Sequence, residues 1–167
     1  MVELVRGDIV AQDVDAIVNA ANEGLWAGGG VCGAIHDAAG PELEKECMAI
    51  VAKSGKVATG SARITKGHRL KARHVIHAVG PRYSGKPEDA LRLASAYRES
   101  MRLAKQNGLG SIAFPSISTG IFGYPLDEAA RIAIDTVTEE MRATGIMLVR
   151  FVLFDSRTYD AYRAALG

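Results

Sequence analysis

Apolar positions along the chain follow two alternating patterns. Short runs rich in β-branched residues predict six strands, at Val2–Val5, Ala16–Asn19, Ser61–Thr65, His74–Ala78, Ser111–Phe114 and Met147–Phe154. Between most of them lie longer segments whose apolar residues are spaced by three and four, as on one face of a helix. Strands that alternate with helices predict an α/β fold, in which a mostly parallel sheet is covered on both faces.

Two helical segments carry an apolar stripe. The first stripe is Ala90, Ala94, Tyr97, Met101 and Ala104, and the second is Leu126, Ala130, Ala133, Val137 and Met141. A further helix is expected to begin among glycines, to break near Gly40-Pro41 and to resume as far as about Lys53. A last helix is expected from about Ser156, as its N-cap, to Leu166.

Composition narrows the class of protein. A length of 167 residues favours one domain, spanning 1–167, and 48% hydrophobic with 23% charged residues excludes disorder. The formal net charge of +1 argues against a general nucleic-acid binder. The start of the chain shows no signal peptide, and no apolar run along the chain is long enough to span a membrane, so we expect a cytoplasmic protein without membrane contacts. Cys32 and Cys47 form neither a disulfide framework nor a zinc cluster, and the four histidines lack metal-ligand spacing. No metal or cofactor is therefore expected.

Glycines concentrate where one predicted strand leads into a helix. Six of the 18 glycines fall between Gly24 and Gly40, and Asn19 and Asn22 precede the run Gly28-Gly29-Gly30. Glycines let the backbone approach a ligand closely, and the helix behind them presents free N–H groups with a partial positive charge. The segment therefore predicts an anion site suited to phosphate, although its spacing matches neither the Walker A nor the GxGxxG pattern.

A second loop of the same kind follows Ser111–Phe114. It runs from Pro115 to Pro125 and combines hydroxyls with two glycines, and Pro125 suits a first helical turn. Two such loops at one sheet edge could hold two linked phosphates, since ligands of parallel sheets bind beyond the carboxyl ends of the strands. Neither loop contains Lys or Arg, so binding would rest on backbone dipoles. The alternative interpretation is that both are ordinary strand-to-helix turns.

These motifs together resemble those of the macrodomain family. The resemblance is carried by Gly7-Asp8-Ile9, by Val14 to Asn22, by Gly28 to Gly40 in the pattern GGGVxGAIHxAAG, by His77 to Pro81 and by Ser118 to Pro125. It covers nearly the whole chain in the right order and is closest to MacroD-type and stand-alone microbial members. It implies a three-layer α/β/α sandwich with a mixed, mostly parallel central sheet, which binds ADP-ribose in a cleft.

The resemblance also implies roles for individual residues. Asp8 and the Ile9 backbone match the adenine-binding positions, and Phe154 matches an aromatic ring beside adenine. Gly30, Val31 and Cys32 match the first diphosphate loop, and Ser118, Thr119, Gly120, Ile121 and Phe122 match the second, with Phe122 flanking the distal ribose. Asn22 matches the asparagine that contacts this ribose near the scissile bond. The alternatives are a turn residue at Asp8 and core packing at Phe154.

The family further implies hydrolysis of mono-ADP-ribose from acidic side chains or of O-acetyl-ADP-ribose. Many members carry Asp in the glycine loop as the base or water-positioning group, where this chain has Cys32. We therefore expect substrate-assisted hydrolysis, in which the diphosphate activates or orients the water while Asn22 holds the ribose, and a small pocket-lining role for Cys32 rather than a nucleophilic one. The alternatives are a non-catalytic ADP-ribose reader and an RNA-binding module. Trp26 is either a lid over the substrate or a surface aromatic.

Overall fold

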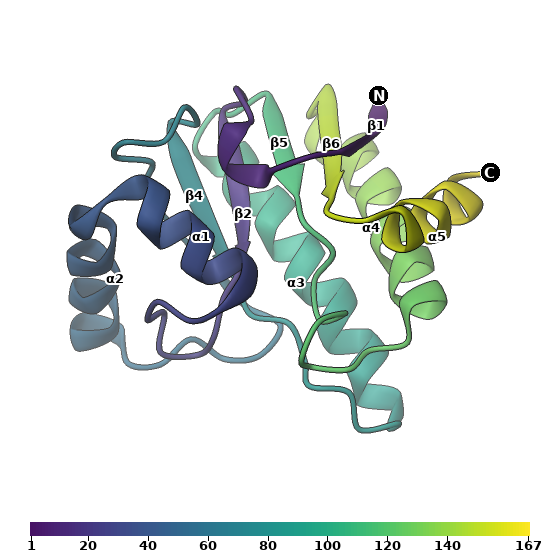
Figure 1. The fold of residues 1–167 in the computed structure, drawn as a ribbon, viewed down its shortest axis with the longest axis horizontal. Coiled ribbons are helices and arrows are strands. Elements are labelled where there is room, and N and C mark those ends of the chain that lie inside the picture. The colour runs from purple at the N-terminus through teal and green to yellow at the C-terminus, as the bar shows by residue number, and fades with distance from the viewer.

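The computed structural model describes residues 1–167 and contains one six-stranded sheet (Figure 1). Its strands are β1 (Val2–Arg6), β2 (Ala16–Ala20), β3 (Ala62–Lys66), β4 (His74–Ala78), β5 (Ser111–Phe114) and β6 (Leu148–Leu153). They lie in the order β1-β6-β5-β2-β4-β3, and all neighbours are parallel except β3 and β4. All six predicted strands are confirmed, with ends that differ by no more than one residue.

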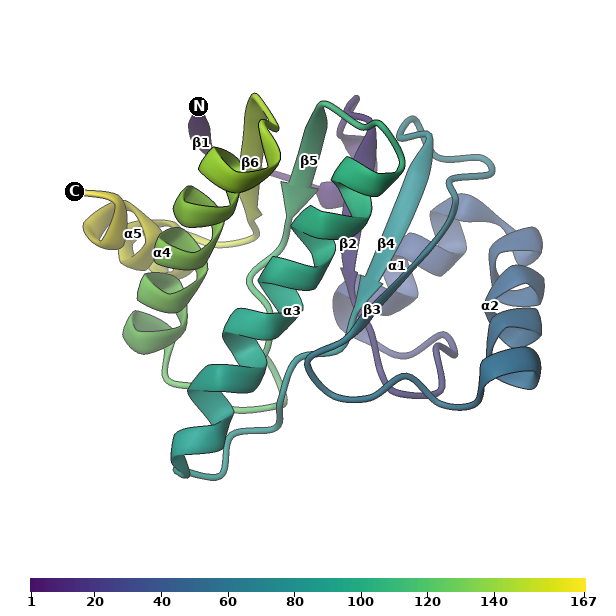
Figure 2. The same cartoon turned by 180° about the vertical axis from the view of Figure 1, so that it is seen from behind.

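Helices cover both faces of the sheet, as predicted. Helices α1 (Gly30–Ala39) and α2 (Pro41–Ser54) lie over one face, and α3 (Pro87–Gln106), α4 (Leu126–Thr144) and α5 (Ser156–Leu166) lie over the other (Figures 1 and 2). Successive strand residues point to opposite faces. Ala16 and Val18 therefore pack into the core beneath α3 and α4, whereas Ile17 between them packs into the core beneath α1 and α2. Because the central strands are buried on both faces, they are nearly continuous apolar runs.

The expected helix break falls where the sequence places it. Gly40 ends α1 with φ +87°, a conformation that side-chain-bearing residues rarely adopt, and Pro41 opens α2. On the long helix α3 the predicted stripe is wrong at its start, since Ala90 is exposed and Leu93 is buried. The reason is Asp89, which turns inward and accepts hydrogen bonds from the backbone N–H groups of Ser84 (2.7 Å) and Gly85 (2.9 Å).

Two predicted helix starts are displaced by one residue. Ser156 is the first residue of α5 rather than its N-cap, and Asp155 caps the helix by accepting from Thr158 N at 2.8 Å. A carboxylate stabilises a helix N-terminus through its charge as well as through the hydrogen bond. Pro125 lies directly before α4, which begins at Leu126.

Sheet order brings the two glycine loops together. Strands β6, β5 and β2 are adjacent and parallel, so their carboxyl ends open at one edge of the sheet. The loops that follow them lie at this edge, and the loop after β4 joins them on the far side of β2. None of the five α-helices has the length and apolar character needed to cross a bilayer.

Candidate functional site

The predicted site residues lie in a row along the carboxyl edge of the sheet. Asp8 follows β1, Phe154 follows β6, the loop from Pro115 to Pro125 follows β5, and the loop from Ala21 to Gly29 follows β2. The row ends in the loop Val79–Lys86 after β4. The edge therefore carries a series of candidate binding positions, each of which follows a different strand.

The first glycine loop packs tightly against the start of α1. A Cβ atom at Gly33 would lie 2.4 Å from the carbonyl oxygen of Gly28, so only glycine allows this approach. Gly30 opens the helix with φ +59°. The first N–H groups of α1, which include those of Val31 and Cys32, have no partner within the helix and are free to bind an anion.

Asn22 closes the first loop on itself. Its Nδ2 donates to the carbonyl oxygen of Trp26 at 2.9 Å, and its Oδ1 accepts from Trp26 N at 3.1 Å. A side-chain amide can make four hydrogen bonds, so one N–H and one oxygen lone pair of Asn22 remain for a ligand hydroxyl. The Trp26 indole lies against Gly24, where any Cβ would overlap the ring, and is 54% exposed.

Cys32 is buried on the inner side of the loop. Its Sγ lies 3.5 Å from Asn19 Nδ2, from which it accepts, and 3.5 Å from the carbonyl oxygen of Trp26, to which it donates. No base contacts the thiol.

A buried polar chain supports Cys32 from below, and no local pattern in the sequence indicates it. Asn19 Nδ2 donates to His77 Nδ1 at 3.1 Å, which leaves His77 Nε2 to donate to Thr65 Oγ1 at 3.0 Å. These residues come from the adjacent strands β2, β4 and β3, so only sheet order reveals their contact. Burial of the His77 ring, with a smaller contribution from His36, lowers the pKa of His77 to about 3, so the ring is neutral.

The second loop is held by tyrosine hydroxyls. Tyr162 OH donates to Ser116 Oγ at 2.8 Å, Thr119 Oγ1 donates to the same oxygen at 2.7 Å, and Ile117 N donates to Tyr97 OH at 3.1 Å. Ser118 has φ +69°, and its buried hydroxyl has no hydrogen-bond partner. A strained residue with an unpaired polar group marks a place where a ligand can supply the partner.

The rim of the second loop meets the loop after β4. The Arg82 guanidinium lies 4.7 Å from the centre of the Phe122 ring, and Tyr83 N donates to the Phe122 carbonyl oxygen at 2.9 Å. Gly120 and Ile121 are exposed at the tip. A Cβ at Gly80 would come within 2.4 Å of Ser118 Oγ and the Ile117 side chain, so the two loops are in direct contact.

At the other end of the row lie Asp8 and Phe154. Asp8 Oδ1 accepts from Val10 N at 3.1 Å and caps a short 3-10 turn (Ile9–Ala11), so the turn role considered for it is present; its Oδ2 is free. The Ile9 side chain is buried, which leaves only its backbone for a ligand. Phe154 is 87% exposed, so the alternative of core packing is wrong.

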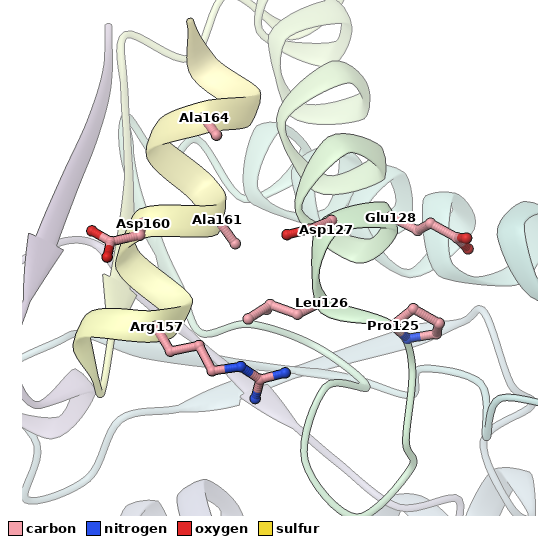
Figure 3. A pocket seen from close by; sticks show the side chains of 8 residues that line it. All are labelled: Pro125, Leu126, Asp127, Glu128, Arg157, Asp160, Ala161 and Ala164. Atoms are coloured by element: carbon pink, nitrogen blue, oxygen red, sulfur yellow. The ribbon is translucent and has the colours of Figure 1, made fainter.

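A further hollow lies outside this row, between the start of α4 and α5. It measures about 880 Å³, and the Arg157 side chain extends across it toward Leu126 (Figure 3). A smaller hollow of about 330 Å³ shares Leu126 and Arg157 and includes Thr119. No local sequence pattern predicts either hollow, because α4 and α5 meet only through tertiary packing. The chain contains no group of three or more His, Cys, Asp or Glu residues placed to hold a metal ion.

Comparison with known proteins assigns the chain to a family. The profile of the family described as Macro domain matches residues 18–133. A macro domain-containing protein of Caldanaerobacter subterraneus is 52% identical over 166 residues, which cover 98% of this chain and 94% of that protein. A macro domain-containing protein of Streptomyces griseus is 51% identical over 169 residues, which cover 100% of this chain and 95% of that protein.

Solved structures agree with this assignment. The Oceanobacillus iheyensis macrodomain with ADP superposes with a TM-score of 0.95 at 44% identity, covering 99% of this chain and 89% of that one. The Trypanosoma brucei macrodomain in complex with ADP-ribose superposes with a TM-score of 0.90 at 41% identity, covering 99% of this chain and 69% of that one. The expected family is confirmed, and so is the expected sandwich fold: this chain belongs to the macro domain family.

Proposed function

We propose that this protein binds ADP-ribose along the carboxyl edge of its sheet and hydrolyses ADP-ribosyl esters there. The substrates would be proteins mono-ADP-ribosylated on acidic side chains, O-acetyl-ADP-ribose, or both. The observation that carries the proposal is the pair of facing loops, one with free helix N–H groups and one with the unpartnered Ser118 hydroxyl. Family members with ADP-ribose or ADP bound support the choice of ligand.

The row of residues suggests how the ligand lies. Asp8 Oδ2 would accept the adenine amino hydrogen beside the Ile9 backbone, and the exposed Phe154 ring would cover the base. The diphosphate would lie between the N-terminus of α1 (Gly30, Val31) and the tip of the second loop, where backbone N–H groups favour negative charge. The distal ribose would then reach Asn22 and Phe122.

Hydrolysis would use a water molecule oriented by the substrate's own diphosphate. The Cys32 thiol supplies no carboxylate, and its proton is directed at the Trp26 carbonyl. In the proposed reaction the ester C–O bond breaks, the hydroxyl of one water joins one fragment, and its proton passes by way of a diphosphate oxygen to the other. Asn22, through its remaining N–H and lone pair, would hold the ribose during this step.

Binding and turnover are tested separately. Titration calorimetry with ADP-ribose should show one site per chain, and no heat at millimolar ligand would overturn the binding proposal. Release of product from mono-ADP-ribosylated protein and from O-acetyl-ADP-ribose is then measured for wild type, Asn22→Ala and Cys32→Ser. We expect Asn22→Ala to lose most activity and Cys32→Ser to keep most of it. Full activity in Asn22→Ala, or none in Cys32→Ser, would rule out this mechanism.

A reader without turnover is the second candidate function. It is favoured by the inward orientation of Cys32 and by the absence of a carboxylate at this position in the first loop. Thermal stabilisation by ADP-ribose with no product from either substrate would support this candidate over the enzyme.

A further inference from the structure

Beyond the two glycine loops, the loop after β4 (Val79–Lys86) forms the last position along the carboxyl edge. The sheet order β1-β6-β5-β2-β4 is a linear series, with Asp8 at one end and this loop at the other. If the base lies at the β1–β6 end and the diphosphate lies over β5 and β2, whatever is attached to the distal ribose must leave the protein beside the loop after β4.

Of the two cations in this loop, Arg82 and Lys86, Arg82 is the one that contacts the second loop. Its guanidinium lies over the Phe122 ring, with 4.7 Å between its central carbon and the ring centroid. A guanidinium has five N–H donors in its plane, and a cation–π contact uses none of them as a hydrogen bond. None of these N–H groups donates a hydrogen bond within the protein, and no carboxylate lies within ion-pair distance of Arg82.

The loop itself holds Arg82 in place. Tyr83 N donates to the Phe122 carbonyl oxygen, and the Tyr83 ring packs edge-on against Tyr124 with 5.0 Å between centroids. Asp89 fixes the following turn through Ser84 and Gly85, so this nearby carboxylate is engaged elsewhere. The guanidinium therefore lies on a supported aromatic ring and keeps its donors unpaired.

We propose that Arg82 is a specificity-determining residue that selects ADP-ribosylated acceptors carrying a carboxylate beside the modified side chain. A planar guanidinium with free in-plane donors matches a carboxylate by two parallel hydrogen bonds. The acceptor class is thus an acidic peptide segment, rather than an uncharged acyl group. The inference rests on the proposed function, because it requires the ligand to lie along the row.

The test compares two peptides ADP-ribosylated on one glutamate, with either acidic or neutral residues flanking that position. Affinity, or kcat/KM where the ester is cleaved, is measured for each, and the ratio between the peptides is the readout. This ratio cancels changes in the nucleotide site itself. Wild type should prefer the acidic peptide about fivefold, as expected for a partly exposed charge pair. The ratio should fall to near one in Arg82→Gln and lie between these values in Arg82→Lys.

Arg163→Gln, at an exposed position of α5, is the matched control for the lost charge. It should keep the wild-type ratio. A wild-type ratio of one, an unchanged ratio in Arg82→Gln, or an equal fall in Arg163→Gln would overturn the role of Arg82 while leaving ADP-ribose binding intact. Failure of wild type to bind free ADP-ribose would instead overturn the proposed function, and this inference with it.

Discussion

At the scale of single residues, the most informative groups are buried polar ones. His77 and Asn19 lie in the layer between the sheet and α1, are fully buried, and support Cys32 through one chain of hydrogen bonds. Buried polar groups cost free energy unless they are paired, and here the pairing ties the first loop to the sheet. The chain also requires that His77 stay neutral, since Nδ1 must accept from Asn19.

This requirement predicts acid lability. In the unfolded chain His77 binds a proton as the pH falls through about 6.5, whereas in the folded protein its pKa is about 3. The unfolded state therefore binds more protons, and between pH 7 and pH 4.5 the free energy of unfolding should fall by about 2–3 kcal/mol. Urea unfolding across this range should show that His77→Gln flattens the slope, although the variant is less stable at pH 7. His68→Gln, which instead removes a 2.7 Å contact of a histidine with the Glu46 carboxylate, is the comparison variant and should not flatten the slope.

Ser118 shows a conflict between stability and binding. Its positive φ costs about 1 kcal/mol for a residue with a side chain, and its buried hydroxyl is unpartnered. We expect Ser118→Gly to raise the free energy of unfolding by up to about 1 kcal/mol, since glycine tolerates this conformation. The same variant should bind ADP-ribose at least about fivefold more weakly, because a hydrogen bond to a charged phosphate is lost. Denaturation and calorimetry measure the two effects, and unchanged affinity would show that the hydroxyl does not serve the ligand.

At the scale of elements, the second loop depends on helices that lie behind it. Tyr97 on α3 and Tyr162 on α5 form one hydrogen-bonded chain, in which Tyr162 donates to Ser116 and the Tyr97 hydroxyl lies 3.3 Å from that of Tyr162. The loop is anchored by packing, since Ile117 and Tyr124 belong to the buried core. Hydroxyl groups from α3 and α5 in addition hold its polar atoms in place.

Removal of one hydroxyl tests this support. Tyr162→Phe leaves the Tyr97 proton without an acceptor in a buried place, so we expect a loss of about 1–2 kcal/mol in the free energy of unfolding. Affinity for ADP-ribose should fall in parallel, because Ser116 and its neighbours lose their anchor. Tyr159→Phe makes the same chemical change on α5 at a hydroxyl with no hydrogen bond, and thermal melts should show little effect. Equal losses in both variants would contradict the role of Tyr162.

At the scale of the whole molecule, the strands and the two glycine loops could be predicted from local pattern. Glycine runs, turn residues and apolar spacing depend on neighbours in the chain, and they placed Gly28–Gly30 and Ser118–Phe122 at strand ends. The sheet order could not be predicted in this way. The hydrogen-bonded chain Asn19–His77–Thr65 and the contact of Arg82 with Phe122 depend on that order, so they could not be predicted either. These contacts join residues that are far apart in sequence, so no local period reports them.

The order of the strands makes a final prediction about how the ligand is laid out. If the base lies at the β1–β6 end, AMP should shift the backbone amide resonances of Asp8, Ile9 and Phe154. Ribose 5-phosphate, which lacks the base, should instead shift those of Asn22 and Phe122, near β2 and β5. Both fragments carry a phosphate and should shift the amides of the glycine loops between these ends.

Titrations of labelled protein by NMR would follow these resonances. The hollow between α4 and α5, which we expect neither fragment to enter, serves as an internal control. This hollow is lined by Arg157, a cation that would attract either fragment. It is also lined by three carboxylates, whose negative charges oppose a phosphate: Asp127, Glu128 and Asp160. We therefore expect no shift at Leu126 or Ala161. Shifts in the hollow with none along the carboxyl edge of the sheet would mean that the ligand does not follow the strand order. Identical shifts from both fragments would mean the same, since each fragment carries only one end of ADP-ribose, the base or the distal ribose.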